Sequence, residues 1–144
     1  MRSLLVLVMV VGSVSLAAAQ ASGPDGATLA ALFPRALGGL PRLEVNAYSN
    51  FATTRYGTAS DAIVLQFHEV RGAGAAAYQR SICPTLEPVA GHPACISHRH
   101  GTEVTWVLND TLQINVGGPS DAEVRRVAAL LDLAPLARLA GSAH

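Results

Sequence analysis

The chain has 144 residues, with ten basic and ten acidic side chains and no formal net charge at pH 7. This length suffices for one domain that buries a sizeable core. The balanced charge argues against nucleic acid as a partner, because such a partner would need a basic face, and it gives no attraction to an anionic membrane surface. Every basic side chain is arginine, which we interpret as a sign of a GC-rich, bacterial genome.

The first residues have the three parts of a secretory signal peptide. Arg2 supplies the positive start, Leu4 to Leu16 form an apolar stretch, and Ala17 to Ala19 provide a small-residue cleavage site. A membrane anchor is the alternative, but a transmembrane helix needs roughly 20 apolar residues, and this stretch is shorter. We therefore expect residues 1–19 to be cleaved, and residues 20–144 to be exported to the periplasm or the medium without an integral membrane segment.

The two cysteines fit this exported location. Cys83 and Cys95 in a secreted chain are most simply joined in one disulfide. Closing a loop of about 13 residues should stabilise the fold by roughly 3 kcal/mol. No Cys-x-x-Cys motif is present, and His92 inside the loop has no obvious acid to orient it. A structural bridge is therefore favoured over a redox or nucleophilic cysteine.

The N-terminal part predicts a short helix followed by a strand. Apolar residues at helical spacing indicate the helix, which Asp25 or Thr28 can cap and which Pro34 should end near Leu32. From Arg42 the apolar period changes to two, which predicts a half-buried strand; TTRYG (53–57) continues this strand or forms a second short one. The apolar residues are Leu29, Leu32, Phe33 and Leu37 in the helix, and Leu43, Val45, Ala47 and Phe51 in the strand.

The run LFPRALGGLPRLEV, from Leu32 to Val45, resembles the opening of small exported bacterial proteins of uncharacterised function. In those proteins a Pro-x-x-Leu-Gly-Gly turn also leads into a strand with an arginine near its start. The resemblance rests on turn and packing residues. It implies a similar fold at this point and carries no catalytic residue across to this chain.

A further strand and a second helix are predicted before the disulfide loop. In AIVLQFHEV (62–70) apolar and polar residues alternate, which predicts a strand with His68 on its more polar face and Glu69 on the other. The segment AAAYQRSI (75–82) is rich in helix formers. This helix should end before the Cys-Pro dipeptide that follows, because a residue that precedes proline is disfavoured in helical geometry.

The strands on either side of Asn109 raise a question of register. A two-residue turn, Asn109-Asp110, would place apolar residues of the first strand beside polar residues of the second. A three-residue loop, Asn109 to Thr111, instead gathers six apolar residues on one face. We favour this odd loop or a bulge, although such loops prefer Gly or Asn where the chain has Thr111. The six residues are Val104, Trp106, Leu108, Leu112, Ile114 and Val116.

Ser120 and Glu123 form the signature of a capping box at the start of a C-terminal helix. In this motif the serine hydroxyl accepts a hydrogen bond from the third amide, and the glutamate reaches back to the cap. One face of the predicted helix is apolar, and Arg125 and Arg126 lie outside it. Residues 132–144 predict a short turn and a tail. The apolar face consists of Val124, Val127, Leu130 and Leu131.

Together these elements predict one α+β domain over residues 20–144, with a flexible lead at 20–26 and a tail at 141–144. Strands that follow one another in the chain tend to pair, and their apolar faces need a cover. We therefore expect an antiparallel sheet of about five to six strands, with helices packed on one face.

His98 and His100 are the sharpest candidates for chemistry. Two residues apart on a strand, they would project to one face and could bind one metal ion, with His92 as a third ligand. Such histidines usually have an acidic partner behind them, and only Glu87 and Glu103 lie near in sequence. A polar hairpin tip is the simpler interpretation, so we assign no metal and no cofactor.

No motif of a known catalytic class is present. The chain lacks a Gly-x-Ser-x-Gly elbow, a His-Glu-x-x-His helix, a phosphate-binding loop and a dinucleotide-binding glycine pattern. The favoured function is a small exported, non-catalytic domain that binds an envelope component, a protein or a small ligand. A periplasmic metal-binding protein that uses its surface histidines is the alternative, and an enzyme of unknown class comes third.

Overall fold

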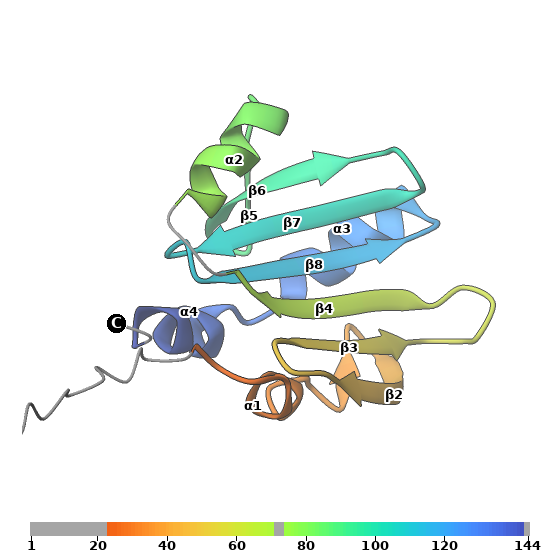
Figure 1. Ribbon diagram of the computed structural model, residues 1–144. Helices are drawn as coiled ribbons and strands as arrows, with labels where there is room; N and C mark the ends of the chain where they lie inside the picture. The colour runs from red at the N-terminus through yellow and green to blue at the C-terminus, as the bar shows by residue number, and fades with distance from the viewer. Residues whose placement is uncertain (1–22, 71–73, 143–144) are drawn as a thin grey trace, which may run out of the picture.

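The computed structural model describes residues 23–70 and 74–142, so the predicted signal peptide lies outside the described residues. It shows one antiparallel sheet of eight strands, in the order β1-β2-β3-β4-β8-β7-β6-β5, with four helices around it (Figure 1). The strands are β1 Ala36–Leu37, β2 Leu40–Ala47, β3 Phe51–Tyr56, β4 Ile63–Glu69, β5 Glu87–Val89, β6 His92–Ser97, β7 Thr102–Leu108 and β8 Leu112–Gly118; the helices are α1 Gly26–Ala30, α2 Ala75–Ile82, α3 Asp121–Leu130 and α4 Ala134–Gly141.

The predicted α+β class and antiparallel sheet are confirmed, but the predicted number of five to six strands is too low. The additional strands are β1 and β5, with two and three residues. Each is too short to show an alternating pattern, and each pairs only with the strand that follows it in the chain. They are defined by their partners rather than by their own sequence.

The core lies on one face of the sheet, which we call the covered face. Every second residue of β3, β4, β7 and β8 points there and is buried. Helices α1, α3 and α4 pack against these strands, and Figure 1 shows α3 behind β7 and β8. The ring of Phe33 stacks on that of Phe67, with centroids 4.5 Å apart. The indole of Trp106 is fully buried and donates a hydrogen bond to the carbonyl of Val89 at 3.0 Å, so its polar atom is satisfied.

The register across the β7–β8 hairpin confirms the odd loop. Trp106 pairs with Ile114 and Leu108 with Leu112, and all six predicted apolar residues are buried. Positive φ angles fall on Asn109 (50°) and Asp110 (54°), two residue types that tolerate the left-handed region. The Thr111 amide donates to the Leu108 carbonyl at 3.0 Å, which closes a turn over these two residues. Thr111 therefore does not need the left-handed conformation that made the loop look unfavourable.

The predicted half-buried strand at the N-terminal end is wrong in its length and its burial. The chain turns back after β2, and Phe51 begins β3 instead of ending one long strand, so most of TTRYG lies in a second short strand, as the alternative predicts. On β2, Leu43 is 43% exposed and Val45 is 39% exposed, so neither side chain belongs to the core. The first helix is also shorter than its apolar pattern predicts. Asp25 caps it by accepting from the Thr28 amide at 2.8 Å, and Leu37 lies in β1.

The C-terminal helix α3 begins at the predicted cap, where Ser120 accepts a hydrogen bond from the Glu123 amide at 3.4 Å. The carboxylate of Glu123 forms an ion pair with Arg126 at 2.6 Å instead of reaching back as a capping box would require. Leu130, predicted for the apolar face, is 58% exposed, and Ala128 is buried in its place. The predicted turn beyond α3 is the complete helix α4, which extends to Gly141 in the predicted tail.

The disulfide between Cys83 and Cys95 is present and joins the end of α2 to β6. It holds α2 on the side of the sheet opposite to the covered face, where Gln79 donates to the Thr105 carbonyl at 2.8 Å. The expectation that all helices share one face is therefore wrong for α2. No helix within 23–70 and 74–142 has the length and apolar character needed to span a membrane.

Candidate functional site

The structure separates the three candidate histidines. Strand β6 ends at Ser97, so His98 and His100 belong to the turn, where the alternation of a strand no longer applies. His98 lies against the start of α3, with its Nδ1 3.7 Å from Asp121 Oδ1. His100 lines a hollow on the side of the sheet opposite to the covered face. His92 lines a separate hollow beside α2. Among the residues that the structure describes, no group of three or more His, Cys, Asp or Glu side chains could hold a metal ion.

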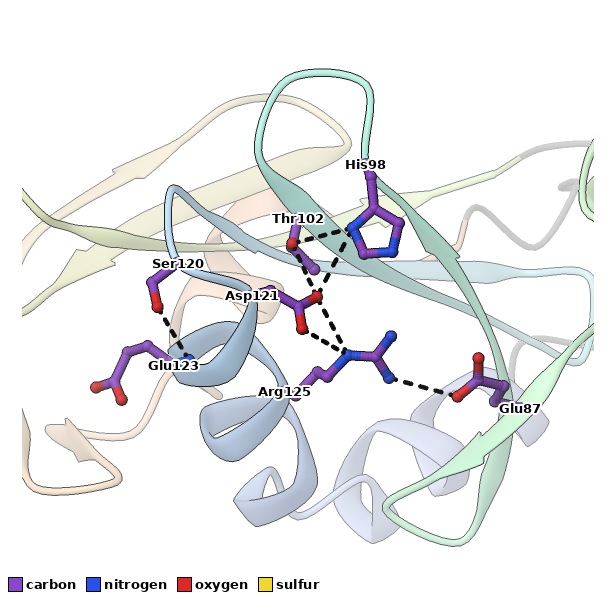
Figure 2. A network of polar contacts seen from close by, with 7 residues as sticks. All are labelled: Glu87, His98, Thr102, Ser120, Asp121, Glu123 and Arg125. Carbon is purple, nitrogen blue, oxygen red and sulfur yellow. Dashed lines mark hydrogen bonds and ion pairs between the residues drawn. The ribbon is translucent and has the colours of Figure 1, made fainter.

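A chain of polar contacts runs from His98 to β5 (Figure 2). The Thr102 hydroxyl donates to Asp121 Oδ1 at 3.1 Å and lies 3.2 Å from His98 Nδ1. A hydroxyl has one proton to donate, so His98 Nδ1 carries a proton and donates to Thr102. On the other side, Arg125 Nε donates to both carboxylate oxygens of Asp121 at 3.2 Å, and its Nη1 donates to Glu87 at 3.4 Å.

This network connects the β6–β7 turn, strand β5 and helix α3. Hydrogen bonds from Arg125 and from Thr102 hold the pKa of the Asp121 carboxyl below its ordinary value. The Asp121 side chain is 53% exposed, and exposed ion pairs contribute little to the free energy of unfolding. Thr102 is only 4% exposed and its proton is donated to Asp121, so it is no available nucleophile. We interpret the network as a clamp that orients the turn on α3.

The other side of the sheet, which we call the open face, has a different composition. Register aligns Thr53, Gln66, Asn115 and Thr105 in one row across β3, β4, β8 and β7. All four are partly exposed and uncharged. Gln113 donates to Asn115 at 3.1 Å. The side chains of Thr53 and Gln66 have no hydrogen bond to another described residue.

Other open-face residues are accessible to solvent as well, some partly exposed and others, like Glu103, exposed. His68 lies there beside Gln66, as predicted, with its ring edge-on to Phe51. Arg55 and Glu44 form an ion pair at 2.7 Å, so these two charges cancel. Within the described ranges, α2 is the one helix on this face, and it lies over β6 and β7 at the upper end of the sheet in Figure 1. The open face over β3, β4 and β8 consists mainly of polar side chains without a cover.

Two adjacent hollows lie on the open face. One, of about 500 Å³, lies near the β6–β7 turn and is bordered by Gln66, Asn115 and His100. The other, of about 450 Å³, lies between α2 and strands β6, β7 and β8. Glu103 borders both hollows, so they adjoin each other. We call the second hollow the α2 groove; it is lined by Tyr78 and Ile82 of α2 and by Ser97, Arg99, Glu103, Thr105 and Gln113 of the sheet and turn, with other residues.

Two residues of the α2 groove are missing from the candidates that the sequence predicts. Tyr78 is 67% exposed and Ile82 is 61% exposed, although both are large and apolar. They are four residues apart on α2, which places them on one side of the helix. In the sequence AAAYQRSI, the pattern that could have indicated them is that the two largest apolar residues lie on one side of the helix. In the structure, the buried residue of this helix is instead Gln79. The sequence alone does not show that the polar Gln79 faces the sheet while the apolar Tyr78 and Ile82 face solvent, because this depends on how α2 lies on the sheet.

Comparison with protein-family models, with curated proteins and with solved structures gives no match to this chain.

Proposed function

We propose that this chain is a small exported, non-catalytic domain that binds an uncharged envelope component through its open face. The observation that supports this most directly is the row of Thr53, Gln66, Asn115 and Thr105 on an uncovered part of the sheet. Partly buried amides and hydroxyls lose water contacts, and a bound partner that supplies hydrogen bonds recovers this loss. The covered face, by comparison, already has three helices as partners.

The chemistry of the open face favours an uncharged ligand. Amide and hydroxyl groups donate and accept hydrogen bonds without a net charge, and Arg55 is neutralised by Glu44. Neither a polyanion nor a strongly basic peptide finds a complementary field there. Export is supported by the predicted signal peptide and by the disulfide, since disulfides persist in oxidising compartments.

The proposal is tested with the oxidised chain 20–144 and three probes: purified bacterial cell-wall glycan, vesicles of bacterial phospholipid, and a soluble envelope-protein extract. Co-sedimentation or pull-down measures the retained fraction. Gln66→Arg places a bulky charge in the middle of the row. Ala129→Arg adds the same charge at an exposed position of α3, on the other side of the sheet, and serves as the matched control.

We expect at least one probe to retain the wild-type chain and Ala129→Arg alike, with at least a tenfold loss for Gln66→Arg. Circular dichroism of all three proteins controls for folding. Two outcomes contradict the proposal: no retention by any of the probes, or equal retention of Gln66→Arg and the wild type.

A further inference from the structure

The α2 groove has two walls of different chemistry. On one side Tyr78 and Ile82 present apolar surface from α2, and on the other Arg99 and Glu103 present one charge of each sign. Ser97, Thr105 and Gln113 lie among the lining residues from the strands. Its volume of about 450 Å³ falls in the range of small-ligand sites, roughly 300–1,000 Å³. A ligand that fits must be amphipathic and carry no net charge.

We infer that the α2 groove binds a neutral sugar ring of a glycan chain, which rests on the proposed binding function of the open face. A pyranose has an apolar C–H face and a rim of hydroxyl groups that each donate and accept hydrogen bonds. The exposed ring of Tyr78 offers the flat apolar surface that such a C–H face packs on, with a polar tip at its end. The polar lining offers both donors and acceptors to the rim.

Hydrogen-bonding capacity is left over in the groove. The side chains of Ser97 and Arg99 have no hydrogen bond to any described residue. Gln113 uses its amide nitrogen on Asn115, and Thr105 donates to one carboxylate oxygen of Glu103 at 3.3 Å. The carbonyl oxygen of Gln113 and the second oxygen of Glu103 therefore remain as acceptors beside the donors of Arg99. This mixture suits hydroxyl groups, which need both.

Other ligand classes fit the groove less well. A lipid chain needs apolar surface on all sides, but the sheet contributes Ser97, Thr105 and Gln113. An extended peptide that adds to a sheet needs a free strand edge, whereas the groove lies over the face of β6, β7 and β8. A polyanion needs several unpaired basic residues, and Arg99 has Glu103 in the same lining.

The groove is held open before any ligand arrives. The disulfide fixes the end of α2 to β6, and Gln79 fixes its middle to the Thr105 carbonyl. At its start, the Ala76 amide donates to the Asp110 side chain at 2.7 Å. A wall that is fixed in advance loses little entropy on binding. The arrangement therefore favours selection of a rigid ring over a flexible chain.

The test is a titration of the oxidised chain 20–144 with a neutral tetramer of N-acetylglucosamine and, separately, a neutral tetramer of glucose. Amide chemical shifts in NMR report where each binds, and the Kd follows from the same titration. We expect at least one of them to bind with a Kd of about 10 μM to 1 mM and to shift the amides of α2, β6 and β7.

Two tyrosines provide a matched pair of variants. Tyr78→Ala should weaken binding at least tenfold, because it removes the ring that packs on the sugar. Tyr48→Ala removes a ring of similar exposure, 60% exposed and stacked on Phe51 outside the groove, and should leave the Kd unchanged. Glu103→Gln should weaken binding without altering the fold.

The inference is overturned if neither tetramer shifts the groove amides at millimolar concentration, or if Tyr78→Ala and Tyr48→Ala bind equally. Should cell-wall glycan, vesicles or protein be retained in a Gln66-dependent way while both tetramers fail, the groove assignment falls and the proposed function stands. If the chain binds none of these probes, both the groove assignment and the proposed function are wrong.

Discussion

The two faces of the sheet come from the same strands and differ in almost every other respect. On β4, Leu65 and Phe67 point to the covered face and are fully buried, whereas Val64 and Gln66 point to the open face and remain partly exposed. The covered face is apolar and has three helices as partners. The open face has polar rows, two adjoining hollows and, within the described part of the chain, the one disulfide-linked helix α2. Stability therefore resides mainly on one face, which leaves the other available for recognition.

We expect the largest difference between the two faces from substitutions of two neighbouring residues on β7. Trp106→Ala should lower the free energy of unfolding by about 3–5 kcal/mol, because it empties a fully buried site on the covered face. Thr105→Ala, one residue earlier on the open face, should cost no more than about 1 kcal/mol. Urea unfolding followed by circular dichroism measures both. Equal losses would contradict the division of roles between the faces.

The disulfide should give the second largest effect. Within α2 the buried residue is Gln79, so this helix has little apolar burial of its own and depends on the bridge at its end. Replacing both cysteines by alanine should lower the free energy of unfolding by roughly 3 kcal/mol. Limited proteolysis should then cut first around α2, while α3 on the covered face stays protected. Cleavage that begins at α3 or α4 instead would show that α2 is secured without the bridge.

These two predictions also mark where sequence reasoning succeeds. The alternation in β4, β7 and β8 and the disulfide are predictable because they are local: a side-chain period of two, or two cysteines in a chain with a predicted signal peptide. The six apolar residues of the β7–β8 hairpin decide the register, because a slip of one residue would move all the apolar side chains of one strand to the open face. Such features need no knowledge of distant parts of the chain.

The features that sequence reasoning misses depend on tertiary partners. Strands β1 and β5 are too short for a pattern and are defined by their pairing. Val45 is exposed although it alternates with polar residues, and Ala128 replaces Leu130 in the core because of how α3 lies on the sheet. The same holds for the candidate site. His98 meets Asp121, which is distant in sequence, and the groove forms only when the disulfide places α2 over β6 and β7.

A smaller effect should appear at the polar clamp below the β6–β7 turn. The pKa of Asp121 is lowered in the fold, chiefly by hydrogen bonds from Arg125. A lowered carboxyl pKa stabilises the fold above the unfolded value, near 3.8, and this contribution is lost as the pH falls through the folded pKa. Between pH 6 and pH 3 the wild-type chain should therefore lose more stability than Asp121→Asn, as measured by urea midpoints.

Substitution of Arg125, which donates to the Asp121 carboxylate, is the control for this prediction. Arg125→Met should reduce the same pH dependence, and the double variant should lose little more than either single one, because both changes remove one interaction. High salt should weaken the effect, since the pair is exposed. Additive losses in the double variant would show that Asp121 and Arg125 act separately.

The smallest effect concerns the loop that decides which face each residue of β8 occupies. Asn109 has a φ of 50°, a region that glycine enters without a steric cost, so Asn109→Gly should stay within about 0.5 kcal/mol of the wild type. Thr111 is outside that region and its hydroxyl donates to the Asn109 carbonyl at 2.9 Å. Thr111→Gly should therefore cost about 0.5–1 kcal/mol through lost hydrogen bonding and added chain entropy. If Thr111→Gly stabilised the protein in urea unfolding, the left-handed position would lie at residue 111. The assignment of a turn over Asn109 and Asp110, which places the apolar residues of β7 and β8 on the covered face, would then be wrong.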